Sequence, residues 1–114
     1  MVTPSAASIV LVSFPFSDLS RTKLRPAVVL ASAGLEDWVL CQVTSNPYAD
    51  VRAVEISNGD FLTGGLTRTS YARPGKLFTA NRGLIVKEAG VLKGELFELI
   101  IEAIIKLLRS NINP

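Results

Sequence analysis

Short apolar runs separated by turn residues fill most of the chain, and they predict a sheet of short strands. The runs at 8–14 and 38–45 are rich in β-branched or alternating apolar residues, which is the pattern of a strand. Further strands are predicted at 26–31, 51–57, 66–73, 76–79 and 83–90. Proline, glycine and asparagine clusters end them, including Asn46-Pro47 and Pro74-Gly75. About five to seven short strands with such turn signals favour a small barrel or a sandwich.

The run at 26–31, PAVVLA, differs from its neighbours because it is apolar without alternation. Such continuity is typical of a strand that is covered on both faces. Arg25 stands directly before it, and Pro26 restricts the preceding backbone to extended conformations. A guanidinium is therefore expected at the start of a buried strand. It is either an ordinary surface charge or a group that the strand serves to orient.

The C-terminal region has a helical pattern instead. From Glu95 to Leu108, ten of fourteen residues are apolar, and the exceptions recur three or four residues apart, at Glu95, Glu98, Glu102 and Lys106. This spacing places the charges on one stripe of an α-helix. The run is too short and too charged to span a membrane. The wide apolar surface predicts a helix that packs on its own sheet and on a second copy in a homodimer, although strands and loops of the same chain are an alternative cover.

Composition narrows the class of protein. A chain of 114 residues suits one domain, residues 1–114, and its 48% apolar content argues against disorder. The single cysteine, Cys41, excludes an internal disulfide and a cysteine-based zinc site, and its apolar surroundings predict burial. Histidine is absent, which removes the commonest general base and metal ligand. No secretory signal is visible at the N-terminus, so a cytoplasmic location is expected.

Basic and acidic residues are segregated along the chain although the net charge is only +2. Two windows, between Asp18 and Glu36 and between Asp60 and Glu88, contain no acid and hold eight of the twelve basic residues. This pattern indicates a positive face and an anionic partner. Solvated loop charge explains it equally well.

Candidate chemistry lies at the predicted strand ends. Arginines and hydroxyl side chains recur there, namely Arg25, Thr44, Ser45, Arg68 and Ser70. In a small barrel, adjacent strand ends bring such groups to one rim. Guanidinium groups bind phosphate bidentately and stabilise the charge that develops during phosphoryl transfer. The set therefore suits a phosphodiester, although each residue taken singly is more often a surface group.

Three segments carry a resemblance to a known family. The stretches "IVLVSFPFSDLSRTKLRPAVVLAS", "WVLCQVTSNP" and "GGLTRTSYARPGKLFT" occur in the order found in the MazF/PemK toxin endoribonucleases of type II toxin–antitoxin systems, and the resemblance runs from Ile9 to about Leu108. It implies a mainly β fold, a small SH3-like barrel of the CcdB/MazF/PemK type with a C-terminal α-helix. It further implies a homodimer that cleaves single-stranded mRNA without a metal or cofactor, through attack of a 2′-hydroxyl on the adjacent phosphate. A cognate antitoxin protein would be its partner.

The resemblance also assigns roles to residues. Arg25 and Thr44 match the family's catalytic arginine and threonine, and the position of Ser70 matches a third catalytic residue. The residues expected to contact RNA are Lys23, Ser45, Arg68, Arg73 and Lys76. The loop from Phe16 to Leu24 matches the segment that borders the RNA groove and is displaced by antitoxin.

Ser70 is a departure from the family pattern, because many members have an acidic residue there. A serine hydroxyl is not a base at neutral pH. Asp18 or Glu36 replaces the missing carboxylate only if the fold brings one of them near Arg25. Two alternatives to an active ribonuclease therefore stay open: a catalytically weak relative that only binds nucleic acid, and a gyrase-directed toxin of the same fold, as in the CcdB group.

Overall fold

The computed structural model describes residues 3–15 and 22–112, which form seven strands, two short 3₁₀ helices and one α-helix. In chain order these elements are β1 (Ser8–Pro15), β2 (Thr22–Gly34), β3 (Asp37–Thr44), β4 (Val54–Ile56), η1 (Asn58–Asp60), β5 (Phe61–Gly64), β6 (Ser70–Asn81), η2 (Arg82–Leu84), β7 (Ile85–Leu92) and α1 (Gly94–Arg109).

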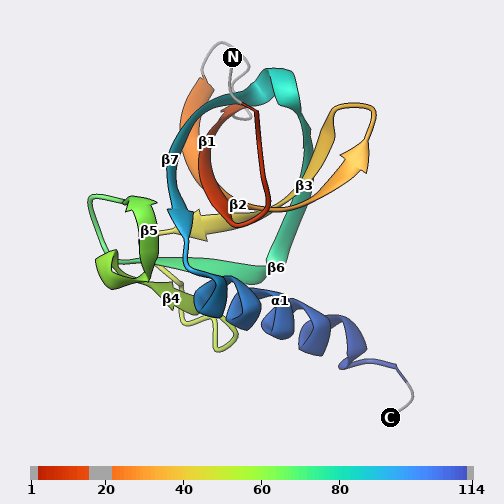
Figure 1. The fold of residues 1–114 in the computed structure, drawn as a ribbon. Helices are drawn as coiled ribbons and strands as arrows, with labels where there is room; N and C mark the ends of the chain where they lie inside the picture. The colour runs from red at the N-terminus through yellow and green to blue at the C-terminus, as the bar shows by residue number, and fades with distance from the viewer. Residues whose placement is uncertain (1–2, 16–21, 113–114) are drawn as a thin grey trace.

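All seven strands belong to one antiparallel sheet with the order β4-β6-β3-β2-β1-β7-β5. The sheet curls strongly, so that β1, β2, β3 and β7 form a rounded half-barrel, and α1 lies along the side formed by β4 and β6 (Figure 1). The predicted fold class, a small mainly β barrel with a C-terminal helix, is confirmed.

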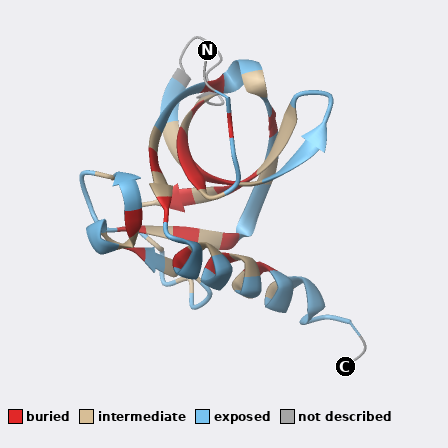
Figure 2. Ribbon diagram, viewed as in Figure 1, coloured by how far each residue is buried: buried red, intermediate tan, exposed pale blue. Residues whose placement is uncertain are grey.

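Two apolar clusters cover opposite faces of the sheet. Ile9, Val28 and Cys41 belong to the cluster beneath α1, whereas their chain neighbours Val10 and Val29 belong to the cluster inside the curl. Because side chains alternate along a strand, β2 contributes to both clusters. Figure 2 shows the buried positions gathered along the inner strands and on the sheet-facing side of the helix. The prediction that the run at 26–31 is covered on both faces holds for Ala27, Val28 and Val29, whereas Leu30 is half-buried and Ala31 is exposed.

Strand β6 corrects the prediction that Pro74-Gly75 separates two strands. It runs through both residues, and the register with β3 shifts between Cys41 and Val43, so that Leu77 and Ala72 are their respective partners. The shift leaves a bulge in β6 that contains Pro74, where no ladder hydrogen bond requires an amide proton. A proline that would end a regular strand is therefore accommodated within this one.

The segment around Gly64-Gly65 is also different from the prediction. Gly64 ends a strand, β5, rather than opening one, and residues 65–69 are a loop before β6. Gly64 has φ +67°, and a Cβ on it would lie 2.2 Å from the carbonyl oxygen of Ala89 on β7. Only glycine fits this close approach. The region predicted as one strand at 51–57 likewise forms a strand only at Val54–Ile56.

The helix α1 begins one residue before and ends one residue after the predicted range. Leu96, Ile100 and Ile104 are buried against the sheet, and the four charged residues of the predicted stripe are exposed. Apolar side chains also remain exposed along the helix, including Leu99 and Leu108. In residues 3–15 and 22–112, no helix is long and apolar enough to cross a membrane.

Cys41 is fully buried, as predicted. Burial raises the pKa of its thiol from 9.0 to about 12, and the sulfur lies 3.2 Å from the carbonyl oxygen of Arg73. The thiol therefore stays protonated and acts as a small apolar side chain with a weak donor.

Candidate functional site

The ends of β2, β3 and β6 meet at one edge of the sheet. The pairing of β2 with β3 ends at Ala27 and Gln42, and Arg25 and Thr44 lie two residues beyond that pair on their strands. Thr44 is in turn paired with Tyr71, the second residue of β6. Segments that are far apart in the chain thus place an arginine, a threonine and Ser70 side by side.

A surface pocket of about 320 Å³ is hollowed at this edge. It contains six of the eight residues predicted as the site, and its lining consists of Leu11, Lys23, Leu24, Arg25, Pro26, Thr44, Ser45, Leu66, Thr67, Arg68 and Ser70. Its cations come from β2 and from the loop before β6. Two guanidinium groups, one ammonium group and several hydroxyls therefore converge on one hollow, which is suited to an anion.

Two hydroxyl groups of the pocket, those of Thr44 and Ser70, are held by neighbouring backbone groups. Thr44 Oγ1 lies 3.1 Å from both the amide nitrogen and the carbonyl oxygen of Asn46, so it accepts from the first and donates to the second. Ser70 is 5% exposed and its Oγ donates to the carbonyl of Arg68 at 3.1 Å. This hydrogen bond therefore connects the start of β6 to the loop that carries Arg68.

No Asp or Glu among the described residues lines the pocket. Glu36 lies in the turn at the far end of β2 from Arg25, where its Oε1 accepts from Nη1 of Arg82 at 3.2 Å. It does not replace the missing carboxylate. Asp18, the other candidate, and most of the predicted antitoxin-displaced loop lie outside the described residues.

Arg73 lies apart from the pocket in a cluster of its own. Its Nε is 3.0 Å from Oδ2 of Asp50, and both side chains are mostly buried, at 20% and 17% exposure. Hydrogen bonds from the amide of Arg52 and from the Arg73 side chain lower the pKa of the Asp50 carboxyl. The guanidinium also lies over the ring of Tyr48, 5.6 Å from its centroid. The sequence pattern assigned no role to Tyr48.

Lys76 is exposed on β6 and lines a separate, smaller hollow of about 200 Å³ with Gln42, Leu77 and Phe78. The structure therefore does not bring Lys76 and Arg73 into the pocket that holds the other predicted residues. Two polar residues of that pocket, Thr67 and Arg68, lie side by side on the loop before β6, and only Arg68 was singled out. The signal for Thr67 was its place directly before the candidate Arg68 in the stretch LTRTS.

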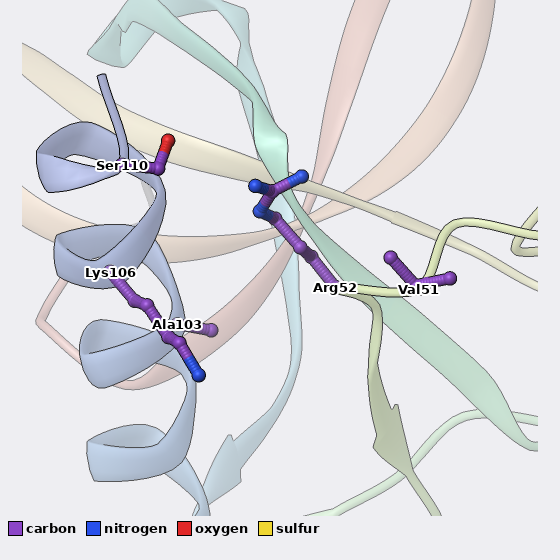
Figure 3. Close-up of a pocket in the computed structure, with 5 residues that line it drawn as sticks. All are labelled: Val51, Arg52, Ala103, Lys106 and Ser110. Carbon is purple, nitrogen blue, oxygen red and sulfur yellow. The ribbon is translucent and has the colours of Figure 1, made fainter. Parts of the chain in front are cut away.

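A further hollow of about 450 Å³ lies between the β3–β4 loop and α1. Figure 3 shows Arg52 of the loop extending toward the helix, with Val51 beside it, Ala103 and Lys106 on α1 and Ser110 directly after α1. It holds two cations, but its one hydroxyl, Ser110 Oγ, donates to the carbonyl of Leu107 at 2.7 Å. The pocket at the strand ends is the better candidate for chemistry, because its lining combines two arginines and a lysine with several hydroxyl side chains.

The residues of the strand-end pocket offer no set of metal ligands, since Lys, Arg, Ser and Thr dominate its polar lining. Elsewhere in the part of the chain that the structure describes, no three His, Cys, Asp or Glu side chains are grouped so as to hold a metal ion.

The family model of the PemK-like, MazF-like toxin of type II toxin–antitoxin systems matches residues 5–108. No individual curated protein matches the chain. A MazE–MazF structure from Deinococcus radiodurans is similar, with a TM-score of 0.75, 16% identity and coverage of 95% of this chain and 97% of that one.

Two mycobacterial structures are similar as well. An endoribonuclease in complex with its cognate antitoxin has a TM-score of 0.69, 16% identity and 95% coverage of both chains. The Mycobacterium tuberculosis toxin MazF-mt6 has a TM-score of 0.67, 16% identity and coverage of 85% of this chain and 91% of that one. The curled sheet with a C-terminal helix is thus a fold that these structures share with this chain.

Proposed function

The chain belongs to the family of PemK-like, MazF-like toxins of type II toxin–antitoxin systems, and on this premise we propose that it is a metal-independent endoribonuclease of single-stranded mRNA in the cytoplasm. The observation that supports the proposal is the pocket in which Arg25 and Arg68 converge with the hydroxyls of Thr44 and Ser45. Such a site binds one phosphodiester and neutralises its charge without a metal ion.

In the proposed reaction the ribose 2′-oxygen forms a bond to the adjacent phosphorus and the bond from phosphorus to the 5′-oxygen breaks. The products are a 2′,3′-cyclic phosphate and a free 5′-hydroxyl, while the 2′-hydroxyl loses a proton and the leaving oxygen gains one. Arg25 binds the non-bridging oxygens, whose negative charge grows in the transition state. Thr44 is assigned to hydrogen bonding at the same phosphate, because it lines the same pocket as Arg25.

Ser70 is assigned a positioning role beside its predicted catalytic one. Its hydroxyl does not remove a proton at neutral pH, and it already donates to the carbonyl of Arg68. The proton from the 2′-hydroxyl must therefore pass to solvent or to a group other than Ser70. If a missing acid limits the rate, Ser70→Asp raises cleavage; a lower rate would assign Ser70 to holding Arg68, and an unchanged rate would contradict both roles.

Binding of the strand on either side of the scissile phosphate is assigned to Lys23, Ser45 and Arg68, which line the same pocket. Lys76 is exposed on β6 and suits a more distant phosphate. Arg73 is committed to Asp50 and Tyr48. Its predicted contribution to RNA binding is therefore indirect.

Two protein partners are proposed. A second copy would cover exposed apolar side chains near the end of α1, Ile105, Leu108 and Ile112, which line one shallow hollow of about 320 Å³. A cognate antitoxin with an acidic or apolar segment would cover the cationic pocket. Sedimentation of the wild type should give a dimer at micromolar concentration, and Leu108→Glu should shift it to monomer; a wild-type monomer would contradict the homodimer.

The test of the proposed activity is incubation of a long, mostly unstructured RNA with the purified protein in excess EDTA. Discrete fragments with cyclic-phosphate ends are expected, and they should disappear with Arg25→Ala. Intact RNA that is nevertheless bound would favour the nucleic-acid-binding relative, for which the absence of a described carboxylate in the pocket is the supporting observation.

A further inference from the structure

Tyr48 presents an aromatic ring to solvent close to the proposed active site. Tyr48 is 67% exposed, and it lies three positions after Ser45, which lines the pocket. Three residues span at most about 11 Å between Cα atoms. A direct chain of hydrogen bonds also connects the two places, because Asn46 bonds to Thr44 Oγ1 at 3.1 Å and its Oδ1 accepts from the amide of Tyr48 at 2.9 Å.

The loop that carries Tyr48 is held in an unusual backbone conformation. Tyr48 and Ala49 have φ angles of +52° and +59°, a left-handed region that residues other than glycine rarely adopt. Backbone bonds from Asp50 to Pro47, at 2.9 Å, and from Ala53 to Asp50, at 3.1 Å, fix the loop. Such conformations persist where the surrounding contacts impose them, and they are concentrated at functional sites.

One face of the Tyr48 ring is already supported. The guanidinium of Arg73 lies over it, 5.6 Å from the centroid, and Asp50 fixes that guanidinium through its 3.0 Å bond to Nε. Because the residue is two-thirds exposed, the remaining ring surface is open to solvent. A cation on one face and an open aromatic surface on the other form a rigid platform rather than a packed core residue.

We propose that Tyr48 is a stacking platform for one unpaired base of the RNA strand whose phosphate is bound at Arg25, with Arg73 and Asp50 as positioning residues. Unpaired bases in RNA are commonly recognised by stacking on aromatic rings and guanidinium planes. The inference rests on the proposed function, since the pocket supplies the phosphate contacts that bring a base to this loop. On this proposal, Tyr48 contacts the base of a nucleotide next to the bond that is cleaved.

The test uses single-stranded RNA oligonucleotides that contain a mapped cleavage site, a 2′-deoxy nucleotide at the scissile position and 2-aminopurine at one flanking position at a time. We compare wild type with Tyr48→Phe, which keeps the ring, and Tyr48→Leu, which keeps apolar bulk. Val51→Ala is the matched control, since Val51 is on the same loop and 93% exposed. Fluorescence quenching reports stacking, and titration gives the affinity.

Tyr48→Phe and Val51→Ala should bind like the wild type, and Tyr48→Leu should bind about 5- to 100-fold more weakly and lose quenching at one position. Wild-type affinity and quenching in Tyr48→Leu would overturn the platform while leaving the ribonuclease proposal intact. A lower melting temperature with unchanged RNA affinity would likewise overturn it and assign Tyr48 to loop stability. Failure of the wild type to bind any of the oligonucleotides would contradict the proposed function itself, and the platform with it.

Discussion

Four arginines of the two acid-free windows lie in two different kinds of surroundings. Arg25 and Arg68 line the strand-end pocket, in which no described residue is acidic. Arg73 and Arg82 lie outside this pocket and make ion pairs with Asp50 and Glu36, which are 23 and 46 positions away in the chain. An acid-free stretch of sequence is therefore not an acid-free surface, and only the first pair is placed to meet a phosphate.

The comparison also separates two uses of an arginine. In the pocket the guanidinium groups are gathered with hydroxyls around a hollow, which is an arrangement for a ligand. At the β3–β4 loop the Arg73 guanidinium is mostly buried and fixes the position of an aromatic ring. If Arg25 and Arg68 bind RNA while Arg73 and Arg82 stabilise the fold, substitutions in the two sets should have different effects.

Arg25→Ala should lower RNA cleavage by about 100- to 1,000-fold, the usual loss when one donor to a developing oxyanion is removed. Its melting temperature should stay close to that of the wild type, because Arg25 is only partly buried. Single-turnover cleavage and thermal melting measure the two quantities. Arg82→Ala is the matched control and should cleave normally; equal losses in both variants would show that the two sets do not differ in this way.

Asp50→Asn should destabilise the fold by about 1–2 kcal/mol, since it removes a charged partner from a mostly buried ion pair. The lowered pKa of Asp50 gives the sign of the pH effect. Its contribution is complete above the unfolded pKa of about 3.9 and is lost as the pH falls through the lower folded pKa. Urea unfolding of the wild type should show the free energy of unfolding contributed by Asp50 being lost as the pH is lowered from 7 to 3. Asp50→Asn should lack this part of the pH dependence.

Arg68→Ala should weaken RNA binding by a similar factor for all sequences, because a phosphate contact carries no base information. For about four phosphate contacts on a single strand, the wild-type slope of log affinity against log salt should be near −3. Removal of one contact should make it less steep by about 0.7. A wild-type affinity that does not depend on salt would contradict the cationic pocket.

Glu36→Gln should have the smallest effect, below about 1 kcal/mol in the free energy of unfolding, because its ion pair is at the surface and Glu36 is 66% exposed. RNA cleavage should be unchanged, since Glu36 lies at the far end of β2 from the pocket. A large drop in cleavage would mean that this carboxylate takes part in proton transfer after all.

The sequence predicted the fold where local pattern and tertiary packing agree. The unbroken apolar run of β2 implied two covered faces, and the spacing of four charged residues implied the exposed stripe of α1. Prediction failed where a tertiary contact overrides a local signal. Pro74 lies inside β6 because a bulge against β3 accommodates it, and Gly64 ends β5 because β7 approaches its backbone closely.

The candidate site, like the fold, could be predicted only where local sequence pattern was sufficient. Arg25 and Thr44 were identifiable as strand-end residues and Ser70 as a candidate on the strand predicted at 66–73, and the sheet order β6-β3-β2 brings them together. The ion pairs of Arg73 and Arg82 depend on contacts across loops that no local pattern encodes. Tyr48 was missed for the same reason, because its exposure and its guanidinium neighbour exist only in the folded chain.

The most direct test of the pocket as the active site is photocrosslinking of an RNA that carries a 2′-deoxy nucleotide at the scissile position and a photoreactive group beside the scissile phosphate. Mass spectrometry then identifies the attached peptides. Crosslinks should map to residues 22–26, 44–45 and 66–70, which come from three separate parts of the chain. Crosslinks confined to the hollow between Arg52 and Lys106, or to the surface of α1, would place the reaction elsewhere and contradict the account.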